Sequence, residues 1–242
     1  VTEGTYSISQ TDGKFKVVGG SLTEDGENLN SLTDAFNKIL SFGTNTNINI
    51  NFDNVNISSG APTLTKGCEL TLKGTYTSEV EAFIIGSNDK FIIHNEADIK
   101  TVKTGSHVIR RSSAPNSTVI FEQSGGTVES VDGFYMYEND VISLKEGRIN
   151  GNVFGNGKGR VEIKGGTWNG QLAHIKDIDI YGGKLNNIKD DTDTIAAIKE
   201  CEEVSISGGS VFAKNTKGKA FAIYMIKNTQ LTLAGNIDVS AS

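Results

Sequence analysis

Apolar and polar residues alternate in a short phrase that recurs along most of this chain, and a pair of glycines follows several of its copies. Three copies read VEIKGG (161–166), IDIYGG (178–183) and VSISGG (204–209). Strict alternation indicates a half-buried strand with its apolar residues turned inward. Gly tolerates a positive φ, so the glycines predict a sharp corner directly after each strand.

Further copies extend the pattern over nearly the whole chain. They lie at 15–19, 50–54, 70–74, 91–95, 119–126, 142–146 and 231–235, and the intervals between successive corners from Asn54 to Gly235 run from 17 to 30 residues. A constant strand with loops of changing length is typical of a solenoid, in which each repeat buries its apolar face against its neighbours. A second apolar pair often follows the corner. The pattern therefore predicts an all-β fold, a parallel β-helix of about nine coils over residues 45–242.

Two other architectures explain the pattern less well. A β-sandwich would use hairpin turns, and Asn-Gly pairs do occur at 150–151, 156–157 and 169–170. Those pairs leave the recurring phrase unexplained. A leucine-rich horseshoe requires its own Leu/Asn spacing, which this chain lacks.

One segment has helical rather than strand periodicity. Its apolar residues are Leu32, Ala35, Phe36, Ile39 and Leu40, with Asn30 or Ser31 as N-cap and Gly43 as the stop. A solenoid needs its open end covered, so we predict an N-terminal capping α-helix within a segment 1–44. The phrase at 15–20 is either a first coil or a strand beside this cap. At the other end, we expect the natural protein to continue beyond Ser242, or another chain to cover the last coil.

The repeat register separates the two cysteines. Cys68 and Cys201 occupy similar positions six coils apart, or about 29 Å at the usual strand spacing. A disulfide needs Cα atoms within about 7 Å. Both residues are therefore predicted to be free, inward-facing thiols.

Composition limits the function classes. The formal charge of the 242 residues is −6 and no dense Lys/Arg stripe is present, which argues against a nucleic-acid partner. No apolar run is long enough for a membrane-spanning helix. The chain begins at Val1, so we expect that an upstream segment was removed.

The coils resemble those of the single-stranded, right-handed parallel β-helix proteins of the pectate-lyase-like superfamily, in particular secreted or surface-attached bacterial members with Gly-Gly coils. The phrases at 161–168 and 195–211 carry this resemblance, which covers about residues 45–242. Some of those members are described as carbohydrate-binding, and others are polysaccharide lyases, glycoside hydrolases, adhesins or phage tail proteins. The resemblance implies a fold more specifically than a function.

Stacked coils place outward-facing residues in columns. One column is predicted to hold Lys73, His94, Lys145, Lys164, Tyr181, Ser207 and Ala234, and its neighbour Thr71, Ile92, Ser143, Glu162, Asp179, Ser205 and Thr232. The middle of these columns is a candidate glycan surface, to which Trp168 would add a ring for stacking. The predicted ligand-binding residues are Lys145, Lys164, Tyr181, Glu162, Asp179 and Trp168. Two alternatives stay open: the charges only neutralise one another, and Trp168 only fills the core.

Catalytic and metal-binding patterns are weak. A lyase of this type needs several acidic calcium ligands and a base, and Asp177, Asp179 and Lys164 are its nearest approximation. The acidic run of Asp190, Asp191 and Asp193 is a weak cation site or a solvated turn. The three histidines, His94, His107 and His174, have no carboxylate pattern beside them. The cluster 134–137 (FYMY) is a second contact patch, although alternation would bury half of it.

These observations favour a secreted or cell-surface protein that binds a polysaccharide or host glycan without catalysis. No catalytic residue and no cofactor is predicted, although calcium stays open. No nucleic-acid partner and no membrane insertion are expected, and further domains are expected in the full-length chain. The alternatives are a lyase or hydrolase acting on acidic polysaccharide, and a structural stalk or adhesin segment.

Overall fold

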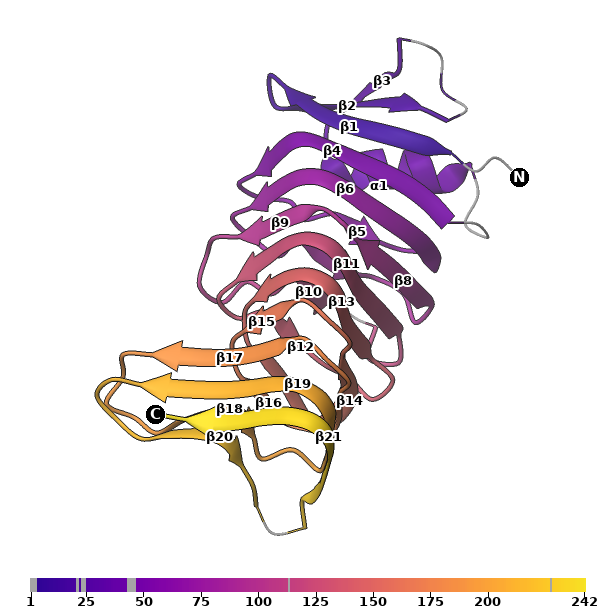
Figure 1. Cartoon of the computed structure of the whole chain (residues 1–242). Coiled ribbons are helices and arrows are strands. Elements are labelled where there is room, and N and C mark those ends of the chain that lie inside the picture. The colour runs from indigo at the N-terminus through magenta and orange to yellow at the C-terminus, as the bar shows by residue number, and fades with distance from the viewer. Residues whose placement is uncertain (1–3, 21, 23–24, 43–46, 113, 227) are drawn as a thin grey trace.

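The computed structural model describes residues 4–20, 22, 25–42, 47–112, 114–226 and 228–242. Its strands stack as successive turns of a parallel-stranded all-β solenoid (Figure 1). The first face is formed by β1 (Thr5–Thr11), β4 (Asn47–Ile57), β6 (Cys68–Ser78), β8 (Lys90–Asn95), β11 (Thr118–Ser130), β13 (Val141–Asn150), β14 (Val153–Ile163), β16 (Leu172–Ile180), β19 (Glu203–Asn215) and β21 (Gln230–Ala241).

Two further faces complete each turn. Several strands of the first face bend at the corner and continue onto the second face, where they pair with β9 (Asp98–Thr101), β15 (Thr167–Asn169) and β17 (Lys184–Lys189). The third face holds the first residues of β14 and β16 together with β5 (Thr63–Leu64), β7 (Phe83–Ile85), β10 (Ile109–Arg111), β12 (Phe134–Tyr135), β18 (Ile195–Lys199) and β20 (Ala220–Tyr224). The predicted parallel solenoid is thus confirmed at the level of strand pairing.

The glycine pairs stand at the corner between the first and second faces. Gly183 has φ +72°, and a Cβ there would lie 2.4 Å from the carbonyl oxygen of Gly165 in the preceding turn. Its neighbour Gly182 has an ordinary φ, but a Cβ there would lie 2.8 Å from the carbonyl oxygen of Lys164. The first glycine is required by close stacking, and the second by stacking and by its left-handed backbone.

The predicted register is correct in the C-terminal half and wrong near the start. Ser143, Glu162, Asp179, Ser205 and Thr232 lie side by side as expected. At the other end, His94 pairs with Thr71 and with Glu122, whereas Ile92 pairs with Glu69 and Ile120. Both residues therefore lie two positions away from their predicted columns.

A buried amide explains this error. Asn95 ends the copy of the phrase at 91–95, which predicts a corner residue, but its side chain is completely buried. Its Nδ2 donates to Oε1 of Gln123 in the next turn at 2.9 Å and to the carbonyl oxygen of Ala97 at 3.0 Å. Because these bonds satisfy the amide, Asn95 occupies an inward position that holds Leu72 in the preceding turn and the equally buried Gln123 in the next.

The helix α1 (Leu32–Ser41) covers the N-terminal end of the core, as predicted (Figure 1). Ser31 is the N-cap, with its hydroxyl accepting from the Asp34 backbone N–H at 3.0 Å, and Gly43 lies outside the described residues. Phe36 from the helix packs against Phe52 and Phe83.

The phrase at 15–20 forms a strand beside the cap rather than a coil. This strand, β2 (Lys14–Gly19), pairs antiparallel with β1 and with β3 (Glu27–Leu29), while β1 pairs parallel with β4. Sequence reasoning missed β1 as the first parallel strand. The division at residues 44 and 45 stays a prediction.

The C-terminal end carries no such cap among the described residues. β21 pairs with β19, and its apolar Leu233 and Val239 are exposed. Continuation of the natural chain beyond Ser242, or a second chain over this end, stays a prediction.

The cysteines are free and buried, as predicted. Burial raises the pKa of the Cys68 thiol to about 12, and nearby Asp89 adds to this rise. Burial likewise raises the pKa of Cys201 to about 11, although hydrogen bonds with the backbone of Ile175, Lys199 and His174 oppose it. Both thiols therefore stay protonated at neutral pH.

Candidate functional site

The predicted charged columns form a ladder of ion pairs on the first face. Glu162 accepts from Lys164 Nζ at 2.6 Å and from a terminal nitrogen of Arg160 at 3.2 Å. The same Arg160 nitrogen contacts Asp179 at 2.7 Å. Arg160, which sequence reasoning missed, thus joins the two acidic residues that the register places side by side. Its position two residues before Glu162 on the alternating strand was the available signal.

The ladder continues across the earlier turns. His94 lies between Glu69 and Glu122, with its ring nitrogens 3.0 Å and 3.1 Å from their carboxylate oxygens. Lys145 contacts Glu122 at 2.6 Å. The prediction that His94 has no carboxylate beside it is therefore wrong, because the register error displaced it. Burial alone would raise the pKa of Glu122, but Lys145 and His94 outweigh burial and lower it.

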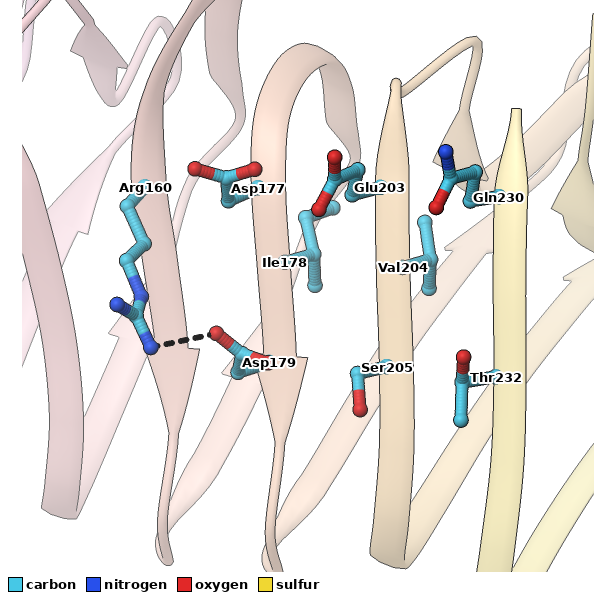
Figure 2. A pocket seen from close by; sticks show the side chains of 9 residues that line it. All are labelled: Arg160, Asp177, Ile178, Asp179, Glu203, Val204, Ser205, Gln230 and Thr232. Atoms are coloured by element: carbon cyan, nitrogen blue, oxygen red, sulfur yellow. Dashed lines mark ion pairs between the residues drawn. The ribbon is translucent and has the colours of Figure 1, made fainter. Parts of the chain in front are cut away.

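A shallow cleft follows Arg160 along the same face (Figure 2). One row of its lining is Asp177, Glu203 and Gln230, and the second is Asp179, Ser205 and Thr232. Its volume of about 260 Å³ lies below the usual range for small-molecule sites. The cleft is acidic, and its single guanidinium already pairs with Asp179 (Figure 2).

Most charges of the predicted glycan surface are therefore engaged with one another. Lys145 and Lys164 each hold a carboxylate, and Glu162 and Asp179 each hold Arg160. Of the two aromatic residues predicted for this surface, Tyr181 has half its surface exposed and Trp168 is buried. The open alternative, mutual neutralisation along neighbouring strands, describes this surface better than a binding site does.

Trp168 is not a surface residue, contrary to its place among the predicted ligand contacts. Its side chain is completely buried between Ile149 and Leu185 of adjacent turns, and its Nε1 donates to the carbonyl oxygen of Gly151 at 2.9 Å. The alternation that turns Val and Ile inward at this position of other turns also turns Trp168 inward. Its role is to fill the core.

The acidic run after β17 is a turn held by its own contacts. Asp190 pairs with Lys217 at 2.8 Å, and the Asp191 carboxylate accepts from the backbone N–H of Asp193 at 3.1 Å. Within the described part of the chain, no group of three or more His, Cys, Asp or Glu residues is placed to hold a metal ion. These contacts favour the solvated turn over the weak cation site.

Exposed aromatic residues stand at both ends of one row of residues on the third face. Tyr135, Phe154, Ala173, Lys199 and Tyr224 follow one another in register on β12, β14, β16, β18 and β20. The exposed fractions of Tyr135, Phe154 and Tyr224 are 37%, 40% and 39%. Four strand steps of about 4.8 Å give this row a length of roughly 19 Å.

Neighbouring rings extend the row. The ring centroid of Phe154 lies 5.6 Å from that of Tyr135 and 5.0 Å from that of His174, and His107 lies 6.5 Å from Tyr135. Phe221 lies 5.6 Å from Tyr224 at the far end. We call Tyr135, Phe154, His174, Phe221 and Tyr224 the aromatic stripe.

A buried ion pair fixes the start of the stripe. Arg111 contacts Asp140 at 2.5 Å, and both side chains are almost fully buried. The guanidinium also lies 4.2 Å from the ring centre of Tyr137, which in turn packs 5.6 Å from Tyr135. The contact patch predicted at 134–137 is thus half correct: Phe134 and Met136 are core residues, whereas Tyr135 is exposed.

Sequence reasoning did not predict the other stripe residues as ligand contacts. Phe154, Phe221 and Tyr224 belong to no copy of the phrase. Irregular loops separate the third-face strands from the phrase, so their inward and outward positions cannot be counted from it. The usable signal was the presence of a large ring in several turns after the second apolar pair.

No family model matches this chain, and neither the curated proteins nor the solved structures contain a significant match. No helix in the described residues is long and apolar enough to cross a bilayer. The function must therefore be argued from the two surfaces themselves.

Proposed function

We propose that this chain is part of a secreted or cell-surface protein that binds a polysaccharide or host glycan through the aromatic stripe, without cleaving it. The observation that carries the proposal is the row on stacked strands of the third face, which has exposed rings at Tyr135 and Phe154 and again at Tyr224, separated by Ala173 and Lys199. Each ring offers a flat apolar surface of the kind that packs against the apolar face of a sugar.

The arrangement of the stripe supports an extended ligand. The rings stand on strands rather than loops, so their spacing is set by the stacking of the turns. Contacts with Phe154 and Phe221 hold the rings of Tyr135 and Tyr224. Preorganised rings lose little side-chain entropy on binding. A row of roughly 19 Å exceeds one sugar ring, so a chain of several sugars is the ligand class it fits.

The fold part of the proposal is a right-handed parallel β-helix of the pectate-lyase-like kind. Parallel strands joined by crossovers in one sheet are right-handed in nearly all known cases, which supports that hand. The Gly-Gly coils support the likeness to secreted and surface-attached members. The expected partners are glycans, with no nucleic acid and no membrane insertion.

A binding screen tests this function. The wild-type protein is applied to a glycan array and to insoluble polysaccharides, alongside a Tyr135→Ala/Phe154→Ala variant. Tyr181→Ala is the matched control, because Tyr181 is an exposed aromatic on the first face. We expect the double variant to bind about tenfold more weakly or worse, from the loss of two ring contacts, and the control to bind like wild type.

Three results would count against the proposal. A screen without any ligand would remove glycan binding. Weaker binding by Tyr181→Ala alone would move the site to the charged ladder. Release of reducing sugar or of unsaturated products from a bound polysaccharide would favour the lyase or hydrolase alternative.

A further inference from the structure

A cleft at the C-terminal end of the aromatic stripe differs chemically from the rest of that surface. It lies between β18 and β20, has a volume of about 330 Å³, and is lined by Thr194, Ile195, Ala196, Lys199, Glu200, Lys219, Phe221 and Tyr224. This volume is at the lower end of the range for small-molecule sites. The cleft therefore has room for a group about the size of one sugar ring.

The base of the cleft is apolar and one wall is aromatic. Ile195 and Ala196 are buried, while Phe221 and Tyr224 are exposed and their ring centroids lie 5.6 Å apart. Ala196 pairs in register with Phe221, and Lys199 with Tyr224. The cleft thus continues the row of Tyr135 and Phe154 rather than forming a separate surface.

The charges of the cleft are unbalanced in favour of an anion. Lys199 and Lys219 take part in none of the ion pairs found among the described residues, whereas Lys145, Lys164 and Lys217 each hold a carboxylate. The one carboxylate in the lining, Glu200, contacts Nδ1 of His174 at 3.5 Å. The lining of the cleft therefore contains two lysines and one carboxylate, an excess of positive charge.

We propose that this cleft is a subsite for a sugar that carries an anionic substituent, a carboxylate, sulfate or phosphate group. The inference rests on the proposed function. The aromatic stripe binds the faces of the sugar rings, and Lys199 and Lys219 bind the anion through charge-assisted hydrogen bonds. The local pair of ammonium groups gives this preference although the chain as a whole is acidic.

Ligand pairs that differ only in charge test the inference. One pair is polygalacturonate and its fully methyl-esterified form, and a second is dextran sulfate and dextran; free inorganic phosphate and sulfate are added as competitors. Binding of each is measured for wild type and for Lys199→Gln/Lys219→Gln. The control is Lys189→Gln/Lys214→Gln, which removes two exposed lysines outside the cleft and changes the net charge equally.

We expect wild type to prefer the charged member of at least one pair by about tenfold, and the preference to weaken with salt. The cleft variant should lose this preference and keep its affinity for the neutral member, while the control keeps both. Competition by free sulfate or phosphate at low concentration would show that the anion alone is the ligand and would overturn the sugar assignment. Equal binding of both members by wild type, or equal losses in the two lysine variants, would also overturn the inference.

The outcomes separate this inference from the function on which it rests. If neutral glycans bind and Tyr135→Ala/Phe154→Ala abolishes that binding, glycan recognition stands even when charge has no effect. If no glycan of either kind binds, both proposals are wrong.

Discussion

Alanine at Gly183 tests whether the glycine pairs are required by the stacking of turns. The matched control is Gly60→Ala, because Gly60 has the same φ of +72° and a Cβ there would have no heavy atom within 4 Å. At Gly183 the new Cβ would lie 2.4 Å from the Gly165 carbonyl oxygen and 2.6 Å from its carbonyl carbon. The two substitutions share the backbone strain and differ in the contact.

The expected magnitudes follow from these two terms. A left-handed conformation costs an alanine roughly 1–2 kcal/mol, and the smaller entropy of the unfolded chain offsets roughly 0.4–1 kcal/mol. We therefore expect Gly60→Ala to lower the free energy of unfolding by about 1 kcal/mol. Because the contact at Gly183 is with backbone, a whole turn must shift, at a cost typical of overpacking, about 2 kcal/mol more. Gly183→Ala should thus lose about 3 kcal/mol.

Equilibrium unfolding in urea measures both variants, and the fluorescence of Trp168 reports on the core next to Gly183. Trp168 is the only tryptophan and is completely buried. The slope of free energy against denaturant is compared among the three proteins, since stacked turns can lose cooperativity. The difference between the variants corresponds to roughly 4–8 °C in melting temperature. Equal losses, within about 0.5 kcal/mol, would refute the stacking argument and leave backbone strain as the only role of the glycine.

Three further predictions follow from buried and paired groups. Cys68 and Cys201 have pKa values raised to about 12 and about 11, so neither should react with a thiol reagent in the native protein at pH 8, whereas both should react in denaturant. A Cys68–Cys201 disulfide found by non-reducing peptide mass mapping would contradict the register. Asp140→Ala leaves the buried Arg111 guanidinium unpaired and should lower the free energy of unfolding, measured in denaturant, by about 3–5 kcal/mol. Glu129→Ala removes one partner of an exposed pair and should lower it by less than about 1 kcal/mol, so similar losses in the two variants would contradict the burial argument. The pKa of Glu122 is lowered in the folded protein, so its ion pairs stabilise the fold fully above the ordinary pKa of 4.5, and this contribution disappears as pH falls through the folded-state pKa. Glu122→Gln should therefore be less stable than wild type at pH 7, and the difference in stability should shrink in acid. A difference that stays constant with pH would rule out this linkage.

The sequence was sufficient for the features that repeat. The phrase predicted parallel turns, the middle of the charged columns and the burial of both cysteines, because each depends on a strand that returns with the same alternation. It failed where one residue departed from the local rule. Asn is a residue type common at corners, but the Asn95 side chain makes the hydrogen bonds of a core position. Counting Asn95 as a corner shifts the predicted positions of His94 and Ile92 by two residues.

The same contrast explains why the charged ladder was predicted and the aromatic stripe was not. Glu162 and Asp179 lie inside the phrase, so their separation along the chain fixes their separation in space. Tyr135, Phe154 and Tyr224 lie beyond loops of unequal length, so only the folded chain brings them into register. Because every turn must stack on the next, the corner positions of the phrase are limited to small residues such as glycine, and its outward charges pair with charges of neighbouring turns. Exposed side chains on the third face are free of that requirement, and this is the physical reason to propose a binding site there rather than in the phrase.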